Sequence, residues 1–130
     1  MFPPEARLID TNILVDLLRG REEARQWIDQ LPDDGRCISV VTAAELLAGA
    51  RSAREQSLIE EELSLYQILW LQEPISRLAL EWYKRFHLRH GVGFLDCLIG
   101  ATALYYDLTL ATLNERHFAP LPDIRVERPY

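Results

Sequence analysis

The sequence predicts an α/β fold with a central parallel sheet. Short apolar segments typical of strands alternate along the chain with longer segments of helical periodicity. Some of the strand-like segments, such as Cys37 to Val41, are almost uninterrupted in apolar residues, as strands buried on both faces are. Because parallel strands are joined by helical crossovers, this order predicts a sheet of about five strands with helices on both faces.

The first predicted strand ends at Ile9. Asp10 follows it directly, and an apolar helix is predicted from Ile13 to Leu18. An acidic residue is therefore placed where a strand stops and a helix starts, and in open α/β sheets this edge is where ligands bind. Asp10 is also a good N-cap residue, so taken alone it is explained better by a purely structural role.

The other elements follow from apolar spacing of three or four in helices and from short apolar runs in strands. The predicted helices are Glu22 to Leu31, Ala43 to Ser52, Gln56 to Tyr66, Ile75 to Arg89, Phe94 to Tyr106 and one turn at Glu115 to Phe118. The predicted strands are Cys37 to Val41, Ile68 to Leu71, Leu108 to Thr112 and Ile124 to Val126. No linker or repeat interrupts this series, so residues 1–130 are predicted to form a single domain.

Composition narrows the classes of function. The net charge of −6 has the wrong sign for binding nucleic acid by bulk electrostatics, and it suits a basic partner or bound cations. Cys37 and Cys97 lie in apolar runs and are expected to be buried thiols in a reducing compartment. No apolar run is long enough to span a membrane, so we expect a cytoplasmic protein without a membrane partner.

Further acidic residues are predicted at the starts of other helices. Glu45 lies one turn past the second strand, and Asp96 lies in the first turn of the helix from Phe94. Each has a structural explanation of its own. Thr42 and Glu45 have the spacing of a capping box, and a negative charge at a helix N-terminus is favourable wherever it occurs, as at Asp96.

Taken together, Asp10, Glu45 and Asp96 predict a metal site. Carboxylates gathered at one sheet edge repel one another, so at least one pKa rises unless a cation neutralises them. Mg²⁺ binds one or two carboxylates and keeps several waters for a substrate that carries phosphate. Asn114, just past the fourth predicted strand, could add a neutral oxygen or hold a metal-bound water, or simply form a turn.

These segments resemble the ordered motifs of the PIN-domain nucleases, and most closely those of the VapC toxins of toxin–antitoxin pairs. The resemblance lies in Ile9-Asp10-Thr11-Asn12, Ala44 to Gly49, Leu95 to Ala103 and Ala111 to Phe118. It implies a three-layer α/β/α sandwich, endoribonuclease activity toward structured RNA such as tRNA, and Mg²⁺ or Mn²⁺ as the cofactor. It also implies a homodimer and inhibition by a VapB-like antitoxin.

The resemblance places Asp10, Glu45 and Asp96 on the family's three principal acids. The fourth position is often aspartate in the wider family and is Asn114 here, which weakens any case for a second tightly bound metal. Thr112 matches a threonine common in the last motif. Because the acids form a pocket of like charge, we expect the antitoxin to insert an Arg or Lys into it, in place of the metal.

Two other functions compete with a nuclease. A catalytically silent module would keep the fold and the acidic pocket and only bind a basic partner, as the net charge and Asn114 allow. A phosphatase with a nucleophilic aspartate after the first strand would need a second acid two residues later, where the chain has Asn12. The basic stretch from Lys84 to His90 is predicted either to position RNA or to be a solvated helix face.

Overall fold

A five-stranded parallel sheet forms the centre of the protein. In the computed structural model, which describes residues 2–130, the strand order is β3-β2-β1-β4-β5 and every pairing is parallel. The strands are β1 (Arg7–Ile9), β2 (Arg36–Ser39), β3 (Gln67–Leu69), β4 (Thr109–Ala111) and β5 (Val126–Glu127). The predicted α/β class and parallel sheet are confirmed.

Alternate residues of the central strands point to opposite faces of the sheet, and this divides the core in two. Leu8, Cys37 and Leu110 are fully buried in one cluster, which helices α5 (Glu73–His90), α6 (Phe94–Tyr105) and α7 (Glu115–Phe118) cover. The next residues along the same strands, Ile9, Ile38 and Ala111, are buried in a second cluster.

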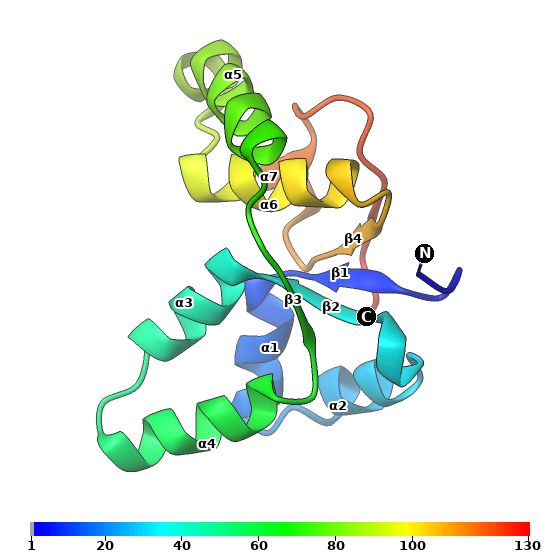
Figure 1. Cartoon of the computed structure of the whole chain (residues 1–130), viewed down its shortest axis with the longest axis vertical. Coiled ribbons are helices and arrows are strands. Elements are labelled where there is room, and N and C mark those ends of the chain that lie inside the picture. The colour runs from blue at the N-terminus through cyan, green and yellow to red at the C-terminus, as the bar shows by residue number, and fades with distance from the viewer. Residues whose placement is uncertain (1) are drawn as a thin grey trace.

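The second cluster lies under helices α1 (Thr11–Leu18), α2 (Glu22–Asp29), α3 (Val40–Ala48) and α4 (Ala53–Leu63). Figure 1 shows these four helices on one side of the sheet and α5, α6 and α7 on the other. The architecture is the expected α/β/α sandwich. The short 3-10 turn Asp33–Gly35 occupies the loop predicted between α2 and β2.

The predicted boundary between β2 and α3 is wrong by about one helical turn. Ser39 ends the strand, and its hydroxyl accepts a hydrogen bond from the Val41 amide at 3.0 Å, so Ser39 is the N-cap and Val40 begins the helix. Thr42, predicted as the cap, lies buried inside α3. The apolar Val40 and Val41 extended the strand prediction because a buried helix start and a buried strand look alike over a few residues.

β5 is shifted relative to its prediction, and the loop after α7 approaches α6 closely at Gly100. Val126 and Glu127 pair with β4, and Ile124 lies before the strand and packs on the core instead. A Cβ placed on Gly100 would lie 2.7 Å from the Cδ1 of Leu121. The loop after α7 therefore packs directly onto the backbone of α6.

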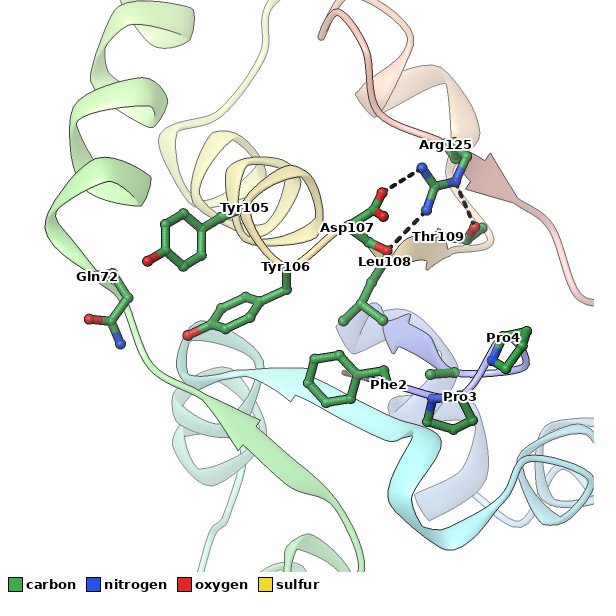
Figure 2. A pocket seen from close by; sticks show the side chains of 11 residues that line it. Phe2, Pro3, Pro4, Gln72, Tyr105, Tyr106, Asp107, Leu108, Thr109 and Arg125 are labelled. Atoms are coloured by element: carbon green, nitrogen blue, oxygen red, sulfur yellow. Dashed lines mark hydrogen bonds and ion pairs between the residues drawn. The ribbon is translucent and has the colours of Figure 1, made fainter.

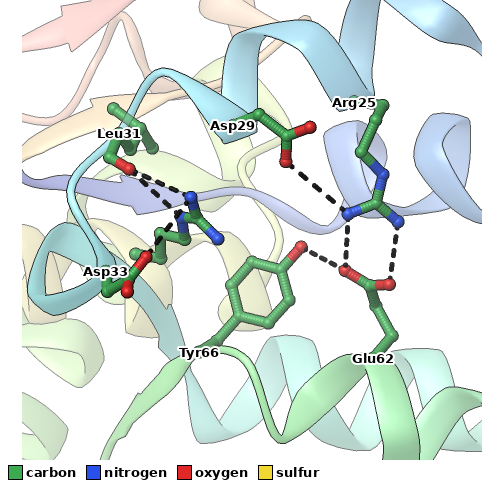
Figure 3. Close-up of polar contacts among 7 residues, drawn as sticks. Arg25, Asp29, Leu31, Asp33, Glu62 and Tyr66 are labelled. Carbon is green, nitrogen blue, oxygen red and sulfur yellow. Dashed lines mark hydrogen bonds and ion pairs between the residues drawn. The ribbon is translucent and has the colours of Figure 1, made fainter.

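An ionic network fastens α4 to α2. The Glu62 carboxylate accepts hydrogen bonds from the Arg25 guanidinium, at 2.9 Å, and from the Tyr66 hydroxyl, at 2.7 Å (Figure 3). Leu63 is the one residue of α4 (Ala53–Leu63) that is buried. This network adds to the packing of Leu63 and Ile59 on the core in holding the helix.

Both cysteines are buried free thiols, as expected. Within residues 2–130, no helix is both long enough and apolar enough to cross a membrane.

Candidate active site

The acids predicted from the sequence come together at the edge formed by the carboxyl ends of the strands. Asp10 follows β1, Glu45 lies on α3 after β2, and Asn114 follows β4, and these three strands are neighbours in the sheet. Asp96 reaches the same place from the first turn of α6. All four line one pocket of about 380 Å³.

Asp10 is the most buried of these acids, with 6% of its surface exposed. One carboxylate oxygen accepts from the Thr11 amide at 2.8 Å, which caps α1, and the other accepts from the Thr112 hydroxyl at 2.7 Å. Burial raises the pKa of Asp10, the two hydrogen bonds lower it, and the charges of Asp96 and Glu45 raise it further. Asp10 therefore both caps α1 and lines the pocket.

Glu45 is held by the threonine that follows Asp10. Its carboxylate accepts a hydrogen bond from the Thr11 hydroxyl at 2.6 Å, and the Thr42 hydroxyl lies 3.0 Å from the same threonine oxygen. The capping box predicted for Thr42 and Glu45 is wrong, because Ser39 caps α3 and Glu45 turns toward α1 instead. The capping explanation for Glu45 is thereby removed.

Asp96 lies beside His117 in the same pocket. The Nδ1 of His117 is 3.6 Å from the Oδ2 of Asp96, and its imidazole is largely exposed. Burial raises the pKa of Asp96, while His117 lowers it and Glu45 raises it. Because the charge of Glu45 raises the pKa of both Asp10 and Asp96, the three carboxylates form one electrostatically coupled group.

Thr112 ties the last motif to the first. Its buried hydroxyl donates to Asp10 and accepts hydrogen bonds from the Asn114 amide at 3.0 Å and from the Asn12 side chain at 3.3 Å. The side chain of Asn114 is exposed and caps no helix, although the residue stands at the N-cap position of α7. The Asn114 amide can therefore contact a molecule bound in the pocket.

The donor set suits a hard divalent cation, although the site is not a closed cage. Asp10, Glu45 and Asp96 present carboxylate oxygens, and Asn114 presents an amide, which are ligand types that Mg²⁺ and Mn²⁺ accept. Within residues 2–130, no three Asp, Glu, His or Cys side chains stand close enough to surround an ion. An open arrangement of this kind leaves several coordination positions to water or substrate, as magnesium sites commonly do.

Several residues of the pocket were not predicted from the sequence, among them Asp16, Arg19 and His117. A signal for two of them existed. Asn12, Asp16 and Arg19 are spaced four and three residues apart, so they form a polar stripe along the otherwise apolar α1. The basic residues Lys84, Arg85 and Arg89, by contrast, do not line the pocket.

The protein has two other cavities. One adjoins this pocket and the other lies at the opposite edge of the sheet. An apolar groove of about 670 Å³ runs between α1, α3 and α4, and it shares Val15, Arg19 and Glu45 with the acidic pocket. Leu46, Leu58 and Ile59 line this groove.

The larger cavity, of about 780 Å³, lies at the opposite edge of the sheet, where β1 and β4 begin (Figure 2). There Arg125 is bound by Asp107 and Thr109, and no group of carboxylates is present among the lining residues. The carboxylates therefore favour the acidic pocket as the active site.

Comparison with known proteins agrees with this geometry. The model of the PIN domain family matches residues 7–122. The chain is 42% identical over 115 residues to ribonuclease VapC10 of Mycobacterium tuberculosis, a match that covers 85% of this chain and 84% of that protein. The chain belongs to the PIN-domain family, in its VapC branch. The resemblance stated from the four sequence motifs is confirmed.

Solved structures place this PIN domain among toxin–antitoxin proteins. The DNA-bound VapBC structure from Salmonella typhimurium superposes with a TM-score of 0.84 at 26% identity, over the whole of both chains. A toxin–antitoxin complex from Klebsiella pneumoniae superposes with a TM-score of 0.80 at 31% identity, covering 96% of this chain and 98% of that one. The three-layer sandwich expected from the sequence is thus the fold of the family.

Proposed function

We propose that this PIN domain is the toxin of a VapBC-type pair and a metal-dependent endoribonuclease that hydrolyses phosphodiester bonds of RNA, with tRNA as the first substrate to test. The observation that carries this proposal is the convergence of Asp10, Glu45 and Asp96, from three separate segments, on one pocket. Two of these acids have raised pKa values, which is the state that a cation would relieve. The relatives named as VapC ribonucleases support the same activity.

In this proposal Asp10, Glu45 and Asp96 hold Mg²⁺ or Mn²⁺, either directly or through bound water. A bound ion of this kind neutralises charge that develops on the phosphate and lowers the pKa of a bound water. Thr112 and Thr11 fix the orientation of Asp10 and Glu45 through their hydroxyls, so that the acids are arranged before substrate arrives. The exposed amide of Asn114 holds a water or a phosphate oxygen at the open side of the pocket.

The test is RNA cleavage by protein purified free of any partner. We expect cleavage of a total tRNA preparation in Mg²⁺ or Mn²⁺, none in EDTA, and recovery when metal is restored. Asp96→Asn should remove activity while the protein stays folded. Asp29→Asn, an exposed acid on α2 outside the pocket, is the matched control and should cleave like wild type. Equal activity in wild type and Asp96→Asn would refute the assignment.

One observation favours a second candidate, a catalytically silent module that binds a basic partner. The carboxylates are not close enough together to surround an ion, and the chain carries a net charge of −6. The same cleavage assay separates the two functions, since the silent module would bind its partner but leave RNA intact at every metal concentration.

We also propose that a VapB-like antitoxin closes the pocket with an Arg or Lys side chain. The apolar groove between α1, α3 and α4 opens beside Glu45, so a partner helix lying in it can present a cation to the acids. Structural neighbours of the chain are themselves VapBC complexes. Excess Mn²⁺ should then weaken the complex by more than an ionic-strength control does, and indifference to Mn²⁺ would place the antitoxin's action away from the acids.

The homodimer implied by the family resemblance is proposed as the unit that the antitoxin binds. The outer surfaces of α5 and α6 carry exposed apolar side chains, including Leu80, Leu88 and Leu95. Such surfaces are typical of contacts between subunits. Analytical ultracentrifugation of the free toxin and of the complex will give both stoichiometries, and a monomer at all concentrations would refute the dimer.

A further inference from the structure

We infer that Arg19 is a substrate-positioning residue that binds an RNA phosphate next to the one being cleaved; this inference rests on the proposed ribonuclease function. Arg19 lines the acidic pocket together with Asp10, Glu45 and Asp96. The acidic pocket repels RNA, which is also negatively charged. A basic residue on the rim of the pocket supplies the positive charge that RNA binding requires there.

The structure leaves the Arg19 guanidinium without an anionic partner. Arg19 is exposed, and within residues 2–130 it takes part in no side-chain hydrogen bond or ion pair. Most arginines of the chain differ in this respect: Arg7, Arg21, Arg25, Arg36, Arg51, Arg77, Arg125 and Arg128 all lie within 4.0 Å of a carboxylate.

The acids around Arg19 are occupied by other groups. Asp16, one turn earlier on α1, accepts from the Tyr130 hydroxyl at 2.8 Å and from Arg21 at 3.4 Å. Glu45 accepts from the Thr11 hydroxyl at 2.6 Å. Because both carboxylates are engaged elsewhere, the guanidinium remains available to an anion that comes from solvent.

The position of Arg19 on α1 sets which phosphate it reaches. Asp10 caps the start of this helix and Arg19 stands at its C-cap. At 1.5 Å per residue, the two backbones are about 13 Å apart along the axis. The Arg19 side chain nevertheless lines the same pocket as the acids, and within residues 2–130 it lies within 4.0 Å of no carboxylate. That separation suits a neighbouring phosphate rather than the scissile one.

Arg19→Gln tests this inference against Arg77→Gln, which removes the same charge from an exposed arginine that lines none of the three cavities. Binding of a labelled mixed-sequence single-stranded RNA is measured in EDTA by fluorescence anisotropy, from about 50 to about 200 mM KCl. A mixed sequence suffices because phosphate contacts are independent of sequence.

We expect Arg19→Gln to lower RNA affinity roughly threefold to tenfold. We also expect the slope of log K against log salt to fall by about 0.7, the value for one contact to a single strand. In cleavage assays KM should rise with kcat unchanged, since a contact to a non-reacting phosphate binds ground and transition states alike. Arg19→Lys should restore the salt slope, because it keeps the charge.

Equal losses in Arg19→Gln and Arg77→Gln would overturn the inference, since bulk charge would then explain both. An unchanged salt slope in Arg19→Gln would overturn it as well. Failure of the ribonuclease proposal looks different: wild type would bind RNA in a manner that depends on Arg19 but would not cleave it in any metal.

Discussion

Thr112→Val is expected to destabilise the protein through Asp10, and the size of the effect follows from the contacts. Valine has nearly the volume of threonine but lacks the hydroxyl, which here is fully buried and donates to the Asp10 carboxylate at 2.7 Å. A hydrogen bond to a charged group contributes about 1.5 to 3 kcal/mol. The same substitution leaves the Asn114 amide without its acceptor. We therefore expect a loss of roughly 2 to 3 kcal/mol at neutral pH.

The loss should depend on pH in a stated direction. The Thr112 hydroxyl favours ionised Asp10, whose pKa burial raises above the ordinary value of 3.8. Removing the hydroxyl raises this folded-state pKa further. Below the folded pKa both proteins carry a protonated Asp10, so the charged component of the bond disappears and the two stabilities converge. The difference in unfolding free energy should grow as pH rises from about 4 to 7.

The assay is thermal and urea unfolding of metal-free protein at several pH values. A loss of 2 to 3 kcal/mol corresponds to a drop in Tm of roughly 6 to 12 °C for a domain of this size. Thr102→Val is the matched control: its hydroxyl is equally buried but donates to the neutral Leu98 carbonyl at 2.7 Å. Its cost should be smaller and independent of pH. A loss in Thr112→Val that does not vary with pH would refute this account of the Asp10 environment.

Three further predictions follow from the same contacts. Asp96→Asn should be neutral or mildly stabilising without metal, because the raised pKa of Asp96 means that its charge disfavours the folded state as pH rises above 3.8; a clear loss of Tm would favour a purely structural role for this acid. Mg²⁺ or Mn²⁺ should stabilise the wild-type protein and so raise its Tm, and the gain in free energy of unfolding is about 2.7 kcal/mol at a metal concentration of one hundred times the dissociation constant. An Asp10→Ala/Asp96→Ala variant should show no rise in Tm. Equal rises in the two proteins would mean that the metal binds elsewhere. Gly100→Ala should cost roughly 1 kcal/mol in chemical denaturation, because its Cβ would lie 2.7 Å from the Cδ1 of buried Leu121, whose displacement outweighs the gain in helix propensity. Gly49→Ala, with 3.4 Å to its nearest neighbour, should cost little; similar costs at both sites would contradict the packing described for α6.

The sequence was sufficient for the parallel sheet and for the identity of the acids. Uninterrupted apolar strands alternating with helices allow few arrangements, and parallel strands bring residues such as Asp10 and Asn114 to one edge whatever the details of packing. The strand order and the close approach at Gly100 add three-dimensional detail, but they do not change which acids meet.

What the sequence did not reveal depends on contacts between distant segments. The capping box assigned to Glu45 had the right local spacing, yet a hydrogen bond to Thr11, 34 residues earlier, decides where the side chain points. His117 gave no local signal at all, because its proximity to Asp96 arises only when α7 packs against α6. Arg19 belonged to a readable polar stripe, but its lack of a partner depends on Tyr130 and Arg21 holding Asp16.

The most direct test of the nuclease centre is a crystal structure of the free protein soaked in Mn²⁺, with anomalous scattering used to locate the ion. We predict a manganese peak in the pocket between Asp10 and Asp96, with Glu45 bound directly or through water and the remaining positions filled by solvent. The same soak of Asp96→Asn should show a weaker peak or none. A wild-type crystal at saturating Mn²⁺ with no peak in this pocket, or with peaks only at other carboxylates, would contradict the proposal that these acids form a metal-dependent active site.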